Sequence, residues 1–274
     1  IFTQQGNIVV AEAGTAAENS GRVSVIDRTN GARRTLIDGL PSGLSGSGDE
    51  AAPSGPAGLA LQGTTLYVVI GGGDGVLPGP APGTEQPNDS PASPILSSLL
   101  SLQLATSLDL ADGGFTLLPG DHDRLKNGET LTLHGANESA MTVTLVADFP
   151  NHTPSFRPDF PANVRAGNPF GVAVLGQTGF VVDASQNLIR SVDTVSGTFT
   201  TLTTFAAVQN PLPFGPPFID PVPDSVTLRG NDLLVTTLTG FPFPPGKAEV
   251  RKVNITTGEN TLYVSGLTSG IDVQ

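Results

Sequence analysis

The side chains best suited to chemistry in this sequence are carboxylates and amides that follow short apolar segments. Glu12 and Asp183 each come directly after such a segment, Asn187 and Asp224 lie near others, and Thr237 stands where a further carboxylate would be needed. Oxygen atoms of these types are the ligands of Ca²⁺, which takes about six to eight of them. If the fold gathers Glu12, Asp183, Asn187 and Asp224, they would hold one Ca²⁺. The alternative is that Asp183 and Asn187 only hydrogen-bond backbone amides of their own turn.

Other catalytic patterns are weaker. The three histidines, His122, His134 and His152, have none of the spacing of a helical zinc site, and we expect them in surface loops. The chain has no cysteine, so it contains no disulfide or thiolate metal site. No glycine-rich segment follows a strand and opens a helix, and nucleotide binding is therefore not indicated. The sequence leaves open whether the protein is an enzyme.

Two proline-rich segments carry phenylalanines that do not belong to any strand pattern. Phe214 and Phe218 flank Gly-Pro-Pro, and Phe241 and Phe243 alternate with prolines. Proline cannot donate to a β-ladder, so these segments are predicted to be loops that hold aromatic rings. Exposed together, the rings would form an apolar binding surface. Alternatively, they fold inward and fill a channel or seal contacts within the fold.

Composition narrows the class of protein. Lys and Arg number 13 against 25 Asp and Glu, a formal net charge of −12, and no basic stripe is present that could neutralise phosphates. We therefore expect no nucleic-acid partner, and no membrane insertion, because the longest apolar-leaning run is interrupted by polar residues. Charged residues make up only 14% of the chain. This low charge, with abundant small polar residues, predicts a secreted or periplasmic protein.

The elements that must position these side chains repeat along the chain. Three segments share an apolar pair, then Asp or Asn, then Gly four residues later, and each continues into a Thr-Leu pair; they are 22–31, 188–197 and 249–258. This pattern predicts a strand, a tight turn that uses the Asx side chain and a glycine with positive φ, and a returning strand. A second strand pair recurs at 58–61 with 66–69, 171–174 with 180–182, and 225–228 with 233–235.

Together the two repeating units make four short antiparallel strands, which is one blade of a β-propeller. The sequence thus predicts an all-β fold, a single propeller domain over 1–274. Residues 6–10 and 270–273 match half-blades, so we expect the native protein to continue at both ends, although the halves could instead close one blade. Residues 71–94 are predicted to be a Pro/Gly-rich loop, and 111–139 an inserted hairpin with a short helix or turn at 121–126.

Several segments resemble the ScyD/ScyE family of scytonemin-biosynthesis-type, NHL-like propellers. They are Asn-Pro-Phe-Gly-Val-Ala-Val at 168–174, Val-Pro-Asp-Ser-Val at 222–226, Leu-Thr-Gly-Phe-Pro-Phe-Pro-Pro-Gly at 238–246, and Gly-Leu-Thr-Ser-Gly-Ile-Asp-Val at 266–273. The resemblance implies a secreted or periplasmic propeller of about six blades in the full-length protein. It implies no reaction, because the family offers no catalytic residues to carry over.

These observations predict a binding or scaffold module outside the cytoplasm that holds a small molecule or protein at the mouth of its channel. The alternative is a Ca²⁺-dependent hydrolase or lactonase with the metal in that channel. The two differ in whether Glu12, Asp183 and Asp224 converge on one ion. Neither the ligand nor the oligomeric state follows from the sequence.

Overall fold

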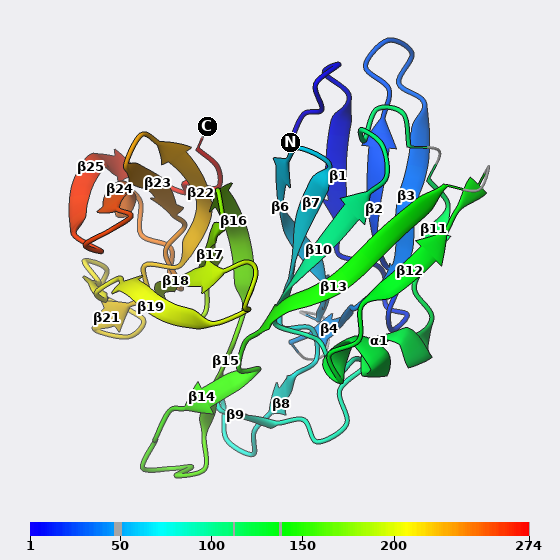
Figure 1. Ribbon diagram of the computed structural model, residues 1–274. Coiled ribbons are helices and arrows are strands. Elements are labelled where there is room, and N and C mark those ends of the chain that lie inside the picture. Colours follow the sequence, from blue (N-terminus) through cyan, green and yellow to red (C-terminus); the bar gives the residue numbers. More distant parts are fainter. Residues whose placement is uncertain (47–50, 112, 137–138, 274) are drawn as a thin grey trace. The chain divides into compact units, whose positions relative to one another are not determined.

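The computed structural model describes residues 1–46, 51–111, 113–136 and 139–273, and their regular structure is almost entirely β-strand (Figure 1). The chain divides into two compact units, Ile1–Asn168 and Pro169–Gln274. The single domain predicted over 1–274 stays a prediction. No helix of the described residues has the length and apolar character needed to cross a membrane.

The first unit contains two large sheets. One has the strand order β1-β2-β3-β11, in which the first three strands are antiparallel and β11 is parallel to β3; the strands are β1 (Ile8–Glu12), β2 (Gly21–Ile26), β3 (Arg33–Leu40) and β11 (Phe115–Thr116). The other is antiparallel, in the order β12-β13-β10-β7-β6, with β6 (Pro56–Gln62), β7 (Thr65–Ile70), β10 (Ser98–Leu104), β12 (Leu131–His134) and β13 (Ala140–Asp148). One apolar core, which includes Leu36, Leu66, Leu100 and Val143, joins the two sheets.

The second unit holds two four-stranded antiparallel sheets of consecutive strands. The first is β16 (Pro169–Leu175), β17 (Thr178–Asp183), β18 (Leu188–Asp193) and β19 (Phe199–Thr204), and the second is β22 (Pro223–Arg229), β23 (Asp232–Thr237), β24 (Ala248–Asn254) and β25 (Asn260–Leu267). Phe180 and Ile189 of one sheet share a core with Val226 and Leu233 of the other. The predicted all-β class, with four-stranded antiparallel blades of the β-propeller, is confirmed.

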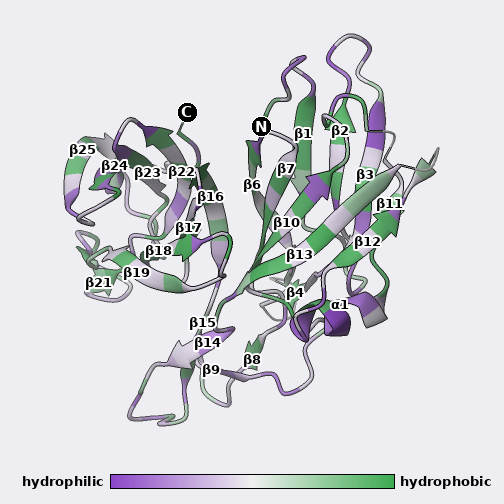
Figure 2. Ribbon diagram, in the orientation of Figure 1, coloured by the Kyte–Doolittle hydropathy of each residue, from purple (hydrophilic) through white to green (hydrophobic). Residues whose placement is uncertain are grey.

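The second strand of the blade is the same in three of these sheets. β7, β17 and β23 each have six residues, of which the last five are buried. Burial on both faces explains why these strands read as apolar runs and do not alternate. Figure 2 shows the apolar residues concentrated in such strands.

The predicted Asx-glycine turns occur at all three positions. Gly31, Gly197 and Gly258 have φ between 71° and 74°, and each donates its N–H to the carbonyl of the Asp or Asn four residues earlier, over 2.8–2.9 Å. The Asp or Asn side chain accepts a backbone N–H inside the turn, as in the 2.7 Å bond from Thr29 N to Asp27 Oδ1. Glycine adopts the left-handed backbone conformation at the lowest cost in free energy, which explains its place in the motif.

Two predictions about connections need correction. The predicted strands at 58–61 (in β6) and 66–69 (in β7) pair with each other, β7 also pairs with β10, and β10 pairs with β13. This sheet is therefore extended by β10 and β13, and not by a strand pair with an Asx-glycine turn. The strands of the 111–139 segment do not pair with each other as a hairpin. β11 adds to β3 and β12 adds to β13, so each completes the edge of a different sheet.

The short helix or turn predicted at 121–126 is a helix, α1 (Pro119–Lys126), which is among the most hydrophilic parts of the ribbon (Figure 2). The expectation that His122 lies in a surface loop is wrong: it lies in this helix and is 1% exposed. Its Nε2 donates to the carbonyl of Gly39 over 2.9 Å, and its Nδ1 accepts from the buried Ser93 hydroxyl over 3.0 Å. Burial lowers the pKa of His122, and the ring serves to anchor α1.

Short hairpins make up most of the remaining structure. The 71–94 loop contains one, β8 (Val76–Pro78) with β9 (Glu85–Pro87), and Asp74 closes its base by accepting N–H bonds from Asn88 and Ala92. The others are β4 (Gly43–Ser45) with β5 (Ala52–Ser54), β14 (His152–Pro154) with β15 (Val164–Ala166), and β20 (Val208–Gln209) with β21 (Phe218–Ile219).

Candidate binding pocket

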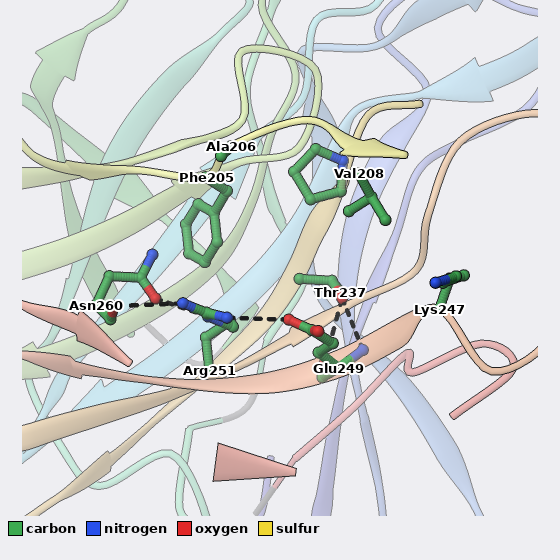
Figure 3. Close-up of a pocket in the computed structure, with 9 residues that line it drawn as sticks. Phe205, Ala206, Val208, Thr237, Lys247, Glu249, Arg251 and Asn260 are labelled. Atoms are coloured by element: carbon green, nitrogen blue, oxygen red, sulfur yellow. Dashed lines mark hydrogen bonds and ion pairs between the residues drawn. The ribbon is translucent and has the colours of Figure 1, made fainter. Parts of the chain in front are cut away.

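A pocket of about 200 Å³ lies within the second unit, where the segment after β19 faces β23, β24 and β25 (Figure 3). One part of its lining is apolar and the other is charged or polar. The lining consists of Phe205, Ala206, Val208, Pro221, Thr237, Lys247, Glu249, Arg251 and Asn260.

The charged side of the pocket is a fixed row of three side chains. Arg251 donates to Glu249 Oε2 over 3.1 Å through Nη1 and to Asn260 Oδ1 over 2.8 Å through Nε. Its Nη2 also donates to the Asn260 carbonyl over 3.2 Å. Figure 3 shows the three side chains in line, with the Phe205 ring facing them. Three bonds to one planar guanidinium fix its orientation.

The residues of β23 and β24 hold this row in place. Glu249 and Arg251 are two apart on β24, so their side chains project from the same face of the sheet. Thr237, at the end of β23, accepts the N–H of Glu249 through its hydroxyl over 2.9 Å. The Thr237 hydroxyl is thus engaged with the backbone of β24.

Lys247 differs from the other charged residues of the pocket. It lies just before β24, is half-buried, and its ammonium has no hydrogen-bond or ion-pair partner among the described residues. In Figure 3 it stands apart from the Asn260–Arg251–Glu249 row. A half-buried ammonium without a protein partner is free to bind an acceptor from solution.

Asp183, one of the four residues predicted to bind Ca²⁺, is held in a buried ion pair. Its carboxylate is completely buried, lies 2.5 Å from Nη1 of Arg190, and accepts the backbone N–H of Gln186 over 3.0 Å. The turn bond to Gln186 is the alternative that the sequence left open. A cation at this carboxylate would have to displace Arg190.

Glu12 is also engaged by arginine. Its Oε2 lies 2.8 Å from Nε of Arg22 and 2.7 Å from Nη2 of Arg33, and its Oε1 accepts the Ser24 hydroxyl over 2.5 Å. These interactions lower the pKa of Glu12 against the opposing effect of burial, which is the largest single contribution. The carboxylate therefore links β1, β2 and β3 across their common face.

The other two predicted ligands are Asn187 and Asp224. Asn187, with φ of 53°, donates to Asp220 over 2.7 Å and accepts the N–H of Val222 over 3.1 Å, so it organises the 220–222 segment. Asp224 is 8% exposed, and burial, together with the nearby Asp272 carboxylate, raises its pKa to about 6. Within the described ranges, no three His, Asp or Glu side chains gather as a metal site.

The aromatic loops are exposed, as one of the two interpretations predicted. Phe214, Phe218, Phe241 and Phe243 are each more than half exposed, and the last two rings meet edge to face with centroids 6.3 Å apart. Asn210 fixes the first loop by donating to the carbonyls of Phe214 and Pro216, each over 2.8 Å. The rings of Phe214, Phe241 and Phe243 therefore project into solvent from loops, and that of Phe218 from the short strand β21.

Reasoning from the sequence missed the pocket. Glu249, Arg251 and Lys252 fall in the repeat at 249–258, from which only a strand and its turn were predicted. The signal that was available is the local sign of charge, because Lys247, Arg251 and Lys252 are three of only 13 Lys and Arg residues in an acidic chain.

The fold defines a protein of the β-propeller class. No protein-family model matches the chain, and no curated protein matches it. Solved structures resemble it at low identity. One is a chain of a nidogen/laminin complex, at 9% identity and a TM-score of 0.42 over 96% of this chain and 64% of that one. The chain therefore spans less than two thirds of that relative.

Two bacterial structures are similar to a comparable degree. A candidate 6-phosphogluconolactonase from Bacteroides uniformis has 16% identity and a TM-score of 0.40, over 99% of this chain and 71% of its own. A candidate oxidoreductase (glucose dehydrogenase) from Thermus thermophilus has 14% identity and a TM-score of 0.32, over 100% and 85%. Similarity at this level carries no statement about activity.

Proposed function

We propose that this chain is a ligand-binding module, and that the pocket containing Lys247 is its small-molecule site. The observation that carries the proposal is that the partnerless ammonium of Lys247 lines the same pocket as a prearranged Arg251. Small-molecule sites combine apolar surface with a few fixed polar groups. This pocket has both, with four apolar and five polar or charged lining residues. The exposed phenylalanines of the two ordered loops are available as a second contact surface for a larger partner.

The alternative of a Ca²⁺-dependent hydrolase has less support. Glu12 and Asp183 already have arginine partners at 2.5–2.8 Å, and Asn187 is hydrogen-bonded on both sides of its amide. A metal at these residues would first have to break the buried ion pair of Asp183, which is costly, and the partly exposed ion pairs of Glu12. The resemblance to the ScyD/ScyE propellers implies no reaction, which supports the proposal of a binding module. The same resemblance supports our further proposal that the protein is secreted or periplasmic.

The test is to block the pocket. Ala206 lines the pocket and is exposed, so Ala206→Trp would fill it without disturbing the core, whereas Ala207→Trp places the same ring at the next exposed residue outside the lining. A fragment library would be screened by protein-observed NMR against the wild type and both variants. We expect hits that shift the resonances of Phe205, Thr237 and Arg251 and that are lost only in Ala206→Trp.

A different pattern would overturn the proposal. Hits that survive in Ala206→Trp would place binding elsewhere in the protein. A library without any hit on the pocket residues would show that the pocket does not act as a binding site.

A further inference from the structure

The hydrogen-bonding inventory of the pocket points to one class of ligand. We infer that the pocket takes a small monocarboxylate with a flat apolar body, about the size of benzoate, with its carboxylate on Lys247. The inference rests on the proposed function, since it names the ligand of the same pocket. It follows from three features: which polar groups are free, the net charge, and the shape of the apolar wall.

Among the described residues, most side-chain acceptors of the pocket are engaged, Glu249 Oε1 being the exception, and the best donor is free. Glu249 Oε2 and Asn260 Oδ1 both accept from Arg251, and the Thr237 hydroxyl serves the backbone of Glu249. The three donors of Lys247 have no partner in the described part of the chain. A ligand that mainly accepts hydrogen bonds therefore matches this pocket better than one that donates.

The charges of the lining residues favour an anion with a single charge. Lys247 and Arg251 are positive and Glu249 is negative, so the lining carries a net charge of one positive unit in a chain of formal net charge −12. One carboxylate neutralises this excess, whereas a doubly charged ligand would add repulsion from Glu249. Arg251 keeps its Glu249 partner, so the ligand charge falls to Lys247.

The apolar wall and the volume set the body of the ligand. Phe205, Val208 and Pro221 provide apolar lining, and Figure 3 shows the Phe205 ring turned toward the charged row. The pocket measures about 200 Å³. An apolar protein cavity of about 150 Å³ accommodates benzene, so this pocket has room for one ring with a carboxylate. Aromatic rings pack well against one another in edge or offset geometry, which suits Phe205 as a partner.

The experiment compares three probes on the intact protein by calorimetry and NMR titration. Benzoate has the charge and the ring, benzyl alcohol has the ring without the charge, and acetate has the charge without the ring. Lys247→Met removes the ammonium at similar length. Lys252→Met is the matched control, because Lys252 lies outside the lining and is 3.8 Å from Asp232. Urea midpoints of both variants establish that each is folded.

We expect benzoate to bind the wild type about 10–100-fold more tightly than benzyl alcohol or acetate, and Lys247→Met to lose about the same factor. Lys252→Met should bind benzoate like the wild type. If benzyl alcohol binds as tightly as benzoate, and Lys247→Met changes neither, the carboxylate class is wrong while the pocket remains a binding site. If no probe shifts the pocket resonances but other fragments do, the inference also fails. If neither the three probes nor any fragment of the library shifts the pocket resonances, both the inference and the proposed function fail.

Discussion

Arg190→Met should destabilise the second unit strongly, because it leaves the carboxylate of Asp183 buried without its partner. Asp183 has no exposed side-chain surface, Arg190 has 6%, and the two are 2.5 Å apart. Removing one partner of a buried ion pair costs about 3–5 kcal/mol, since the remaining charge keeps its desolvation penalty. That is a large share of the ~5–15 kcal/mol that holds a typical domain together.

The double variant Asp183→Asn/Arg190→Met separates the pair from its surroundings. With both charges removed, no ion stays buried, so the double variant should lose less stability than the two single variants summed. We expect a coupling energy of about 2–3 kcal/mol, toward the upper end for residues in contact. The bond from Gln186 N–H to position 183 remains possible with the asparagine side chain.

Urea unfolding followed by circular dichroism measures these changes. At a slope of about 2 kcal/mol per molar urea, a loss of 4 kcal/mol lowers the midpoint by roughly 2 M. Each curve would be recorded in EDTA and in millimolar Ca²⁺, and we expect the same midpoint in both. A loss below about 1 kcal/mol for Arg190→Met would refute the ion-pair reasoning. A Ca²⁺-dependent rise that Asp183→Asn abolishes would restore the metal-site interpretation.

Three further predictions concern single residues. Because the folded protein raises the pKa of Asp224 from 3.8 to about 6, the free energy of unfolding should fall as the pH rises from about 4 to 7. Asp224→Asn should remove this pH dependence. After allowance for solvent screening, the variant should be more stable by about 1–2 kcal/mol at pH 7, as read from urea midpoints. His122 should have the opposite effect, since its pKa is lowered from 6.5: its contribution to the free energy of unfolding is complete above pH 6.5 and declines as the pH falls below that value. If the difference in stability between the wild type and His122→Gln stays constant from pH 7.5 to 5, this prediction is contradicted. Gly258→Ala should destabilise more than Gly31→Ala, although both have φ near 72°, because the new Cβ at 258 would lie 2.1 Å from the carbonyl oxygen of Leu202 while that at 31 meets nothing within 4 Å. The cost at Gly31 should be about 1–2 kcal/mol, from the left-handed backbone alone, and equal losses in thermal melts would show that the steric contact is relieved.

Local patterns in the sequence were sufficient for the blades. The repeat of Asp27 with Gly31, and its two equivalents, predicts a turn whose hydrogen bonds and positive φ all lie within five residues, so no distant contact is needed to form it. The second strand is identifiable in three of the four large sheets for a similar reason, because burial on both faces favours an uninterrupted apolar run. The all-β class followed from such local constraints, whereas the sequence left open whether the proline-bound phenylalanines are exposed or folded inward, and the structure decided that they are exposed.

Tertiary structure alone decided what the polar residues do. Asp183 and Glu12 have side chains of the type that binds metals, but their arginine partners lie up to 21 residues away in the sequence. Strand pairing alone brings these arginines beside the carboxylates. The pocket joins Phe205 to Asn260, a separation that no periodicity encodes. β12 and β11 read as a hairpin because they are close in sequence, yet each finds a better edge in another sheet. Strand identity is a local property of the chain, whereas a site depends on which strands become neighbours, and the free energy that selects those neighbours comes from the packed core.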